Sequence, residues 1–224
     1  LSNLANDLGD AAKGTDNDFR IGPERAIQSG HISQKQMKRA ITINSILCLL
    51  ASGALIYFGA TNMPVKMISF YGILAVLSIL AAITYTVGKK AYGYLGLGDV
   101  MVFIFFGGVS VLGVFSLYSK FFMFENILLA VGVGLLSVAV LNLNNMRDYA
   151  NDKNSGKNTL VVKMGPNNAK FYHTFLILTA LSSFALFINL LQEPILYCVL
   201  APGIYLLFHV RKVMQITKPR NFDP

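Results

Sequence analysis

Residues 126–157 read NILLAVGVGLLSVAVLNLNNMRDYANDKNSGK, and the two halves of this stretch differ sharply in polarity. From Asn126 to Met146 no side chain carries a charge, whereas Arg147 begins a segment rich in acids and bases. A helix needs about 20 mostly apolar residues to cross the hydrocarbon core of a bilayer. The stretch therefore predicts a membrane-spanning helix that ends in a charged cluster at one membrane face.

Five further intervals are equally free of charge: 40–65, 67–88, 100–119, 171–192 and 194–210. The mean hydropathy of +0.54 and the 13% of charged residues also lie outside the usual range of soluble domains. A soluble protein built from six such helices would lack the polar surface that must face water. We therefore expect an all-α, polytopic transmembrane helix bundle, with one domain over residues 1–224 and spans at 126–146 and these five intervals.

The basic residues indicate how the bundle is oriented. Alternating spans place four segments on one membrane face: 1–39, 89–99, 147–170 and 211–224. That face receives all of the 19 lysines and arginines except Lys66 and Lys120. Because lysine and arginine concentrate in cytoplasmic loops, we expect this face to be cytoplasmic. The net charge of +8 then reflects membrane topology, and nucleic acid is not an expected partner.

Acidic side chains gather in two segments of that face. In one, Asn144, Asp148 and Asp152 are spaced four residues apart, which puts them on one side of a helix. In the other, Asn6 and Asp10 have the same spacing. Four spans separate the two segments, so both emerge on the same face and can line one cavity. Carboxylates brought together repel unless cations lie between them, and Mg²⁺ held by carboxylates and substrate phosphates meets this need.

Basic side chains accompany both acidic segments: Lys13, Arg20, Arg25, Arg147, Lys153 and Lys157. Acids and bases together favour a metal–diphosphate site formed by cytoplasmic loops. The alternative interpretation is that these are ordinary solvated loops with incidental charge, because short carboxylate motifs are weakly specific. The presence of two clusters on one face favours the functional interpretation, since carboxylates at a membrane boundary usually serve function.

The acidic segments resemble those of a known family. NDLGD at residues 6–10 and RDYAND at residues 147–152 are similar to the two aspartate-rich motifs of the UbiA superfamily of intramembrane aromatic prenyltransferases. Longer blocks at 6–33, 85–107 and 141–165 resemble the branch whose acceptor is 1,4-dihydroxy-2-naphthoate. The resemblance extends from residue 1 to about residue 172, beyond which the helices are generic.

The resemblance implies a bundle of nine transmembrane helices around a cavity, with the two motifs on opposite sides of its cytoplasmic mouth. The six intervals would be the third to eighth of these helices, and the opening residues would end the second. We therefore expect the chain to be incomplete. The resemblance also implies an integral protein of the bacterial cytoplasmic (inner) membrane, surrounded by lipid.

The implied reaction joins a polyprenyl diphosphate to 1,4-dihydroxy-2-naphthoate, with Mg²⁺ as cofactor, and releases diphosphate and CO₂ to give demethylmenaquinone. The resemblance assigns Mg²⁺ ligands at Asn6, Asp10, Asp148 and Asp152, with Asp7 and Asp16 in support. It assigns diphosphate contacts to Lys13, Arg25, Arg147, Lys153 and Lys157. Acceptor-side candidates are Tyr85, Asp99, Asn144 and Asn145. The residues expected to be catalytic are Asp10, Arg147, Asp148 and Asp152.

One position departs from the superfamily pattern. The first motif commonly carries a third acid four residues after Asp10, and here that position is Gly14. Asp16 follows closely and is the expected substitute, although it matches the motif less directly than Asp10, Asp148 and Asp152 do.

Three other functions remain open at this point. A related prenyltransferase would use another aromatic acceptor, such as 4-hydroxybenzoate, haem or a chlorophyll precursor. An ion transporter would carry charges deep within its spans, whereas every Asp and Glu here lies at or beyond a span end. A structural assembly factor would not need either acidic cluster.

Overall fold

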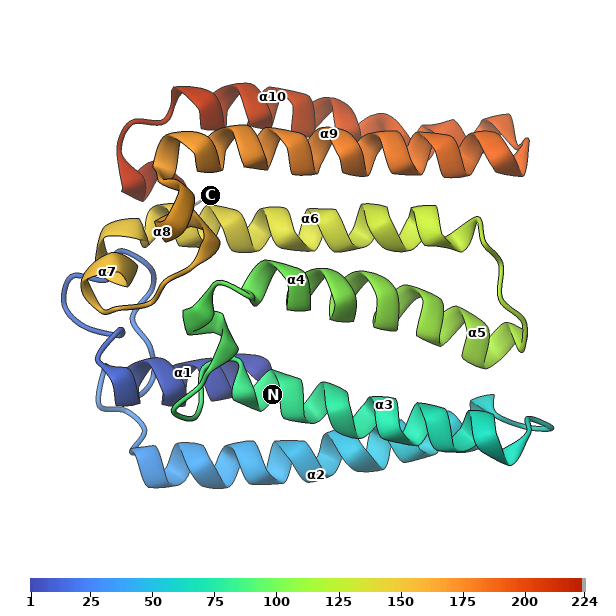
Figure 1. Ribbon diagram of the computed structural model, residues 1–224, viewed down its shortest axis with the longest axis horizontal. Helices are drawn as coiled ribbons and strands as arrows, with labels where there is room; N and C mark the ends of the chain where they lie inside the picture. The colour runs from blue at the N-terminus through green and yellow to red at the C-terminus, as the bar shows by residue number, and fades with distance from the viewer. Residues whose placement is uncertain (223–224) are drawn as a thin grey trace.

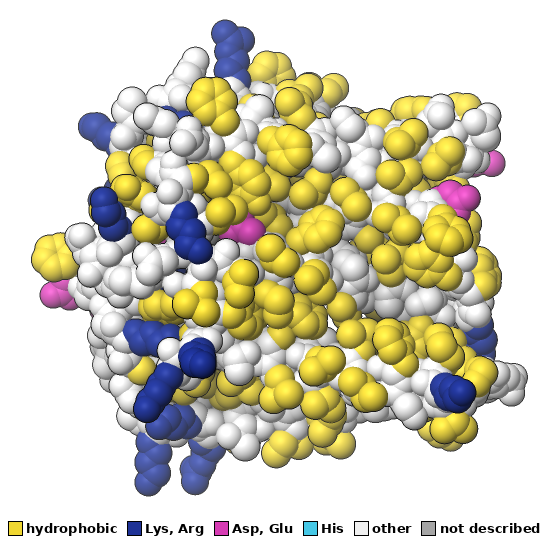
Figure 2. All heavy atoms as spheres, in the orientation of Figure 1, with side chains coloured by type: hydrophobic (Ala, Val, Ile, Leu, Met, Phe, Trp, Pro, Cys, Tyr) yellow, Lys and Arg dark blue, Asp and Glu magenta, His cyan; other side chains and the backbone are white. Residues whose placement is uncertain are grey.

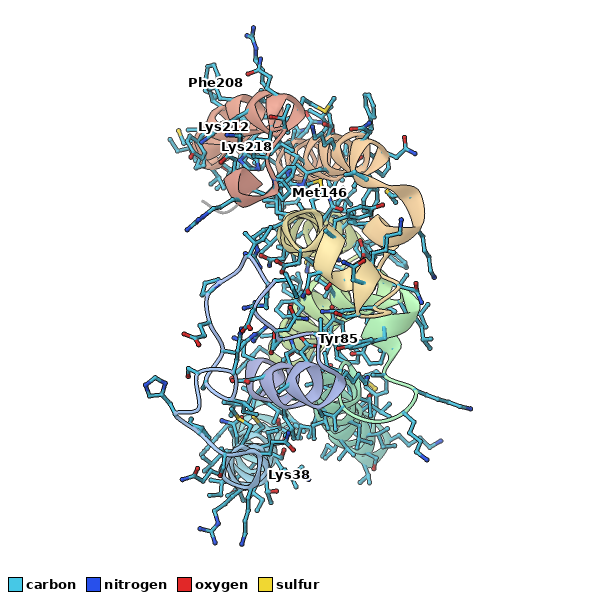
Figure 3. The ribbon with its side chains drawn as sticks, turned by 90° about the vertical axis from the view of Figure 1, so that its left-hand side faces the viewer. Lys38, Tyr85, Met146, Phe208, Lys212 and Lys218 are labelled. Atoms are coloured by element: carbon cyan, nitrogen blue, oxygen red, sulfur yellow. The ribbon has the colours of Figure 1, made fainter. Side chains whose placement is uncertain are left out.

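The computed structural model describes residues 1–222, and every regular element in that range is helical (Figure 1). Six long helical stretches run side by side, while short helices and loops gather at the left-hand end of that view. Seen from that end, the long helices form an elongated array, with α2 and α3 at one edge and α9 and α10 at the other (Figure 3). The predicted all-helical class is confirmed.

The six long stretches overlap the six charge-free intervals of the sequence and are apolar enough to cross a membrane. They are α2 (Gln34–Gly59), α3 (Val65–Thr84), the continuous α4, η2 and α5 (Gly98–Val102, Phe103–Gly113 and Val114–Ser119), α6 (Asn126–Arg147), α9 (Pro166–Leu191), and the continuous η3 and α10 (Pro194–Leu200 and Ala201–Gln215). The shorter elements are α1 (Ser2–Lys13), η1 (Tyr92–Leu95), α7 (Tyr149–Asn154), α8 (Leu160–Met164) and η4 (Pro219–Phe222).

The helix ends differ from the expected boundaries because caps, not charges, end a helix. Helix α2 begins six residues before the expected span, where Ser33 and Gln36 form a reciprocal capping box. The basic residues of its first turns remain exposed, as long basic side chains at membrane boundaries generally do. The same helix ends early, at Gly59, ahead of a turn in which Asn62 adopts a left-handed conformation with φ of 66°.

Large apolar side chains cover the outside of the array. Leu50 and Phe208 are 65% and 67% exposed, and many similar side chains on the spans are exposed as well. Figure 2 shows these apolar side chains across the middle of one face, with most of the basic side chains toward the left-hand end. Exposing so continuous an apolar surface to water is unfavourable, so this surface faces lipid. The helices and this surface identify an integral membrane protein.

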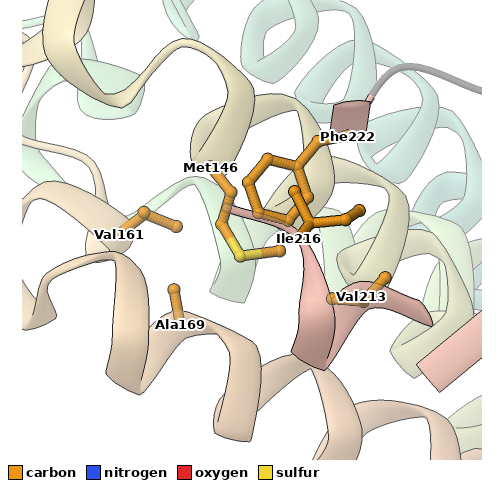
Figure 4. Packing of buried hydrophobic residues seen from close by; sticks show 6 residues of the cluster. All are labelled: Met146, Val161, Ala169, Val213, Ile216 and Phe222. Atoms are coloured by element: carbon orange, nitrogen blue, oxygen red, sulfur yellow. The ribbon is translucent and has the colours of Figure 1, made fainter. Parts of the chain in front are cut away.

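A compact apolar cluster holds the polar end of the array together (Figure 4). Its buried members are Met146, Val161, Ala169, Val213, Ile216 and Phe222. They come from the last turn of α6, from α8, α9 and α10, and from the segment that follows α10 through η4. This packing fixes the direction in which the chain leaves α6 toward its acidic segment.

Two glycines allow η2 and α6 to pack closely within the membrane-spanning part. A Cβ atom on Gly107 would lie 2.5 Å from the carbonyl oxygen of Ala130 and 3.0 Å from Cα of Gly134. Small residues at such crossings let helix backbones approach, which is how membrane helices gain packing energy. Helix η2 is π-helical at this contact, and π-helical turns commonly mark positions where a helix adapts to a neighbour or a site.

Gly107→Ala is expected to destabilise the helix array, because the added methyl group must displace backbone atoms of α6. Inserting a methyl group into close packing costs about 1–3 kcal/mol. Gly108→Ala is the matched control, since a Cβ atom at Gly108 meets nothing within 4 Å. The sequence contains no Trp, so the suitable measurement is the fraction of detergent-solubilised protein that stays monodisperse after heating. Equal heat resistance of the two variants would contradict the packing described here.

Candidate functional site

The two acidic segments meet at the polar end of the array. Asp10, near the end of α1, and Asp152, in α7, are both buried. The ammonium nitrogen of Lys157 lies 3.6 Å from Oδ2 of Asp10 and 3.7 Å from Oδ1 of Asp152. Figure 1 places α1 and α7 at the same end of the bundle. The structure thus brings together two carboxylates that are four spans apart in sequence.

Helix α1 is fixed against the segment that follows α3. Gly9 allows this contact, because a Cβ atom there would lie 2.6 Å from the hydroxyl oxygen of Thr86. The Thr86 hydroxyl donates to the backbone oxygen of Ala5 at 2.9 Å and to Oδ1 of Asn6 at 3.2 Å. Lys13 donates in return to the backbone oxygen of Thr86 at 2.8 Å. These contacts hold the acidic face of α1 in place.

Tyr94, in η1, connects the two acidic segments. Its hydroxyl donates to Oδ1 of Asp10 at 2.7 Å, and the hydroxyl of Thr15 lies 2.6 Å from the same Tyr94 oxygen. Its backbone oxygen accepts from the backbone N–H of Asn158 at 3.1 Å. The ammonium nitrogen of Lys13 lies over the Tyr94 ring, 3.8 Å from its centroid. Burial, and next the charge of Asp10, raise the pKa of Tyr94 above its usual value, so the hydroxyl stays a donor.

The buried carboxyl group of Asp152 is only partly neutralised by Lys157. Burial raises the pKa of the Asp152 carboxyl to about 7; the Lys157 ammonium opposes this shift, while Asp148 and Asp10 add to it. The Oδ2 atom of Asp152 is buried and has no hydrogen-bond partner. Uncompensated carboxylate oxygens of this kind are the ligands that hard divalent cations take. The carboxylates therefore fit a site for Mg²⁺.

The Asp16 carboxylate also lacks hydrogen-bond partners, although two arginines lie beside it. Burial raises the pKa of its carboxyl to about 6; Asp10 adds to this shift, while Arg25 and Arg20 oppose it. Nε of Arg20 and Nε of Arg25 lie 3.2 and 3.8 Å from the two Asp16 oxygens, yet neither oxygen has a hydrogen-bond partner. Arg25, which the sequence predicts to contact diphosphate, thus contacts Asp16 of the same loop in this structure.

Two predicted ligands of the first segment have other partners. Both oxygens of Asp7 accept from backbone N–H groups, those of Ala26 and Ile27, at 3.1 and 3.3 Å. Asp7 therefore ties the loop after α1 back onto that helix. The side-chain oxygen of Asn6 is held by Thr86.

The second acidic segment surrounds a break between two helices. Helix α6 ends at Arg147 and α7 begins at Tyr149, so Asp148 lies at the junction. Nη2 and Nε of Arg147 lie 2.8 and 3.1 Å from the two Asp148 oxygens. A Cβ atom on Gly22 would lie 2.7 Å from Nη2 of Arg147, so the loop after α1 passes directly over this pair.

The remaining predicted residues of this segment differ in exposure. Asn145 is buried, whereas Asn144 and Lys153 are exposed. The side chain of Asn151, which the sequence does not single out, donates to the backbone oxygen of Thr15 at 2.7 Å. That bond is a further direct link between the two acidic segments.

Tyr85, an acceptor-side candidate, lies within electrostatic reach of Asp10, Asp152 and Asp99. Figure 3 shows Tyr85 in the middle of the polar end, between the ribbons of the array. Its ring packs edge to face against Tyr92, with centroids 5.3 Å apart. Burial raises the pKa of Tyr85 above its usual value, and the charges of Asp10 and Asp99 add to that effect. Asp99 is buried and accepts from the hydroxyl of Tyr172 at 3.1 Å.

Within residues 1–222, no three His, Cys, Asp or Glu side chains are grouped as in a closed protein metal site. A divalent cation here would need amide or substrate oxygens as well, which is the usual way in which proteins bind Mg²⁺. Sequence analysis did not single out four residues that hold the two acidic segments in place: Thr15, Thr86, Tyr94 and Asn151. Single uncharged side chains in loops form no pattern, so only the tyrosine-rich character of residues 85–94 hinted at one of them.

Three curated bacterial enzymes of one name are similar in sequence to most of this chain. The curated 1,4-dihydroxy-2-naphthoate octaprenyltransferase of Escherichia coli (strain K12) is 49% identical over 189 residues, which are 84% of this chain and 60% of that protein. The enzyme of that name from Haemophilus influenzae is 46% identical over 180 residues, 80% of this chain and 58% of that protein. The Mycobacterium tuberculosis enzyme of that name is 33% identical over 199 residues, 88% of this chain and 63% of that protein.

The chain spans about three fifths of the length of these curated relatives. No solved structure matches it significantly. The UbiA prenyltransferase family matches residues 1–222, which include both acidic segments and all six spanning stretches. With that match and relatives of this similarity, the chain belongs to the UbiA prenyltransferase family.

Proposed function

We propose that the chain transfers a polyprenyl group from polyprenyl diphosphate to 1,4-dihydroxy-2-naphthoate, releasing diphosphate and CO₂ to give the hydroquinone form of demethylmenaquinone. The observation that carries the proposal is the meeting of Asp10 and Asp152 around Lys157, with buried carboxylate oxygens left unpaired. Such a site is suited to a polyvalent anion accompanied by divalent cations. The names of the relatives supply the substrate class.

Mg²⁺ is the cofactor that we propose for this site. Asp10, Asp148 and Asp152 would hold it, with Asn6 and Asp16 as further oxygen ligands. Oδ2 of Asp152 and both oxygens of Asp16, which are buried and have no hydrogen-bond partner, support this assignment. When bound, the cation would neutralise charge on the diphosphate leaving group.

The protein's own bases have a separate task in this proposal. Lys13 and Lys157 lie beside the carboxylates and would bind the diphosphate as a preorganised pair of positive charges. Tyr85, which interacts electrostatically with Asp10, Asp152 and Asp99, would orient the aromatic acceptor together with Asp99. Arg147 would hold Asp148 through its paired contact.

The prenyl chain needs an apolar path from this site into the membrane. Two apolar cavities of about 340 and 640 Å³ lie along α3 and share Tyr71, Leu74, Val109 and Gly113. The smaller one is lined by Leu1 and Ala82 toward the polar end, and the larger one reaches Lys120 at the opposite end. We assign the polyprenyl tail to this path, since its walls are almost entirely hydrocarbon.

The proposed location is the bacterial inner membrane, with the acidic segments facing the cytoplasm. The end that carries α1, α7 and α8 contains nearly all of the basic residues, and this charge distribution supports that orientation.

Separate Asp10→Asn and Asp148→Asn changes are expected to reduce prenyl transfer nearly to background, because each removes a negative ligand of the proposed cation. The measurement is Mg²⁺-dependent formation of prenylated product in membranes, using a panel of aromatic acceptors that includes 1,4-dihydroxy-2-naphthoate and 4-hydroxybenzoate.

Asp18→Asn is the matched control, because Asp18 is exposed in the same loop as Asp16. Wild-type rates in both variants would refute the metal assignment, and turnover of 4-hydroxybenzoate alone would refute the acceptor. Ion flux in vesicles without product formation would instead indicate a transporter.

Lys157→Met is expected to raise the KM for polyprenyl diphosphate about 10- to 100-fold, because it removes a positive charge that faces both carboxylates. Lys38→Met is the control, since Lys38 is exposed on α2 and points away from the array in Figure 3. Steady-state kinetics at fixed Mg²⁺ measure the effect. An unchanged KM in the Lys157 variant would remove this lysine from the proposed diphosphate site.

A further inference from the structure

Tyr94 is hydrogen-bonded to both acidic segments of the polar end. Its hydroxyl bonds to Asp10 and Thr15, which belong to the first acidic segment. Its backbone oxygen bonds to Asn158, one residue after Lys157, in the second. The neighbouring Leu95 carbonyl accepts from the ammonium of Lys163 at 2.6 Å, which fastens the same loop to α8. Helix η1 is therefore tied to both acidic segments at once.

The hydroxyl of Tyr94 fixes the orientation of the Asp10 carboxylate. Oδ1 of Asp10 accepts the Tyr94 hydrogen bond at 2.7 Å, while Oδ2 faces Lys157 at 3.6 Å. A hydrogen bond to one oxygen fixes the rotation of the carboxylate plane. The Thr15 hydroxyl, which lies 2.6 Å from the Tyr94 oxygen, holds the tyrosine in turn.

Two basic side chains lie near the ring of Tyr94. Its centroid is 3.8 Å from the ammonium nitrogen of Lys13 and 5.5 Å from that of Lys157. Ammonium groups are attracted to the face of an aromatic ring at such distances. Tyr94 therefore holds an acid through its hydroxyl and has two lysine ammonium groups near its ring.

We propose that Tyr94 is a positioning residue, which sets the orientation of the Asp10 carboxylate and the placement of Lys13 and Lys157 for a divalent cation and diphosphate. The inference rests on the proposed metal–diphosphate site and adds a residue to it. Tyr94 acts through these three side chains and transfers no proton or group itself.

Tyr92 provides a matched comparison within the same loop. Its hydroxyl donates to a backbone oxygen, that of Ala81, at 2.7 Å, and its ring packs on Tyr85. Both tyrosines are partly buried, and Phe in place of either keeps the ring; it removes one hydrogen bond at Tyr92, and at Tyr94 the bonds to Asp10 and Thr15. Only Tyr94 is bonded to a carboxylate of the site. A purely structural role for the loop would make the two variants equivalent.

The test uses purified Tyr94→Phe and Tyr92→Phe variants of the chain in lipid nanodiscs. Binding of Mn²⁺, as a spectroscopic substitute for Mg²⁺, is followed by electron paramagnetic resonance with and without inorganic diphosphate. We expect Tyr94→Phe to weaken Mn²⁺ binding about tenfold, as loss of a hydrogen bond to a charged group does. Tyr92→Phe should bind Mn²⁺ as the wild type does. Tyr94→Leu, which also removes the ring, should weaken Mn²⁺ binding in the presence of diphosphate further than Tyr94→Phe.

The outcomes separate this inference from the proposed function. Equal Mn²⁺ affinities of the Tyr94→Phe and Tyr92→Phe variants would overturn the positioning role even if the wild type transfers prenyl groups. Weaker Mn²⁺ binding in the Tyr94 variants alone would support it even if 1,4-dihydroxy-2-naphthoate is not an acceptor. A wild-type protein that binds no Mn²⁺, with or without diphosphate, would overturn both the positioning role and the metal site.

Discussion

Repulsion between buried negative charges is the constraint on which the polar end of this protein depends. Asp10 and Asp152 are both nearly inaccessible to water; burial raises the pKa of the Asp152 carboxyl, and the charges of Asp148 and Asp10 add to that shift. Lys157 relieves part of this repulsion from a position between them. The hydroxyl of Tyr94 relieves another part at the opposite oxygen of Asp10. Oδ2 of Asp152 still has no hydrogen-bond partner, so the polar end is suited to an additional cation.

The rest of the fold keeps the two acids from separating. Apolar packing between α6, α8, α9 and the segment after α10 supports the second acidic segment (Figure 4), and Gly9 lets α1 lie directly on Thr86 beneath the first. The link from Asn151 to Thr15 then joins the two segments directly. None of these contacts involves a residue that carries the proposed chemistry. Their shared effect is that the carboxylates face each other in spite of their mutual repulsion.

The sequence predicted the features that depend on long apolar runs and on counting. Charges delimit the six spans clearly, and an even number of spans requires the two acidic segments to share a face. Helix ends were predicted less well, because the cap at Ser33 is a local hydrogen-bond choice that no charge marks. The partners of Asp7 could not be predicted either, since backbone N–H groups are present at every residue except proline. Tyr94 was indistinguishable from Tyr92 until their hydroxyl partners were known.

The unequal lengths of neighbouring helices place the acids at a particular depth. At 1.5 Å per residue, α2 with 26 residues is about 39 Å long and α3 with 20 residues about 30 Å, close to the thickness of the hydrocarbon layer. The surplus turns of α2 therefore lie among lipid headgroups; α1 lies beside them, and α7 lies farther along the same end of the array in Figure 1. A diphosphate anchored in the bilayer by its own hydrocarbon tail would meet these carboxylates without changing its level in the membrane.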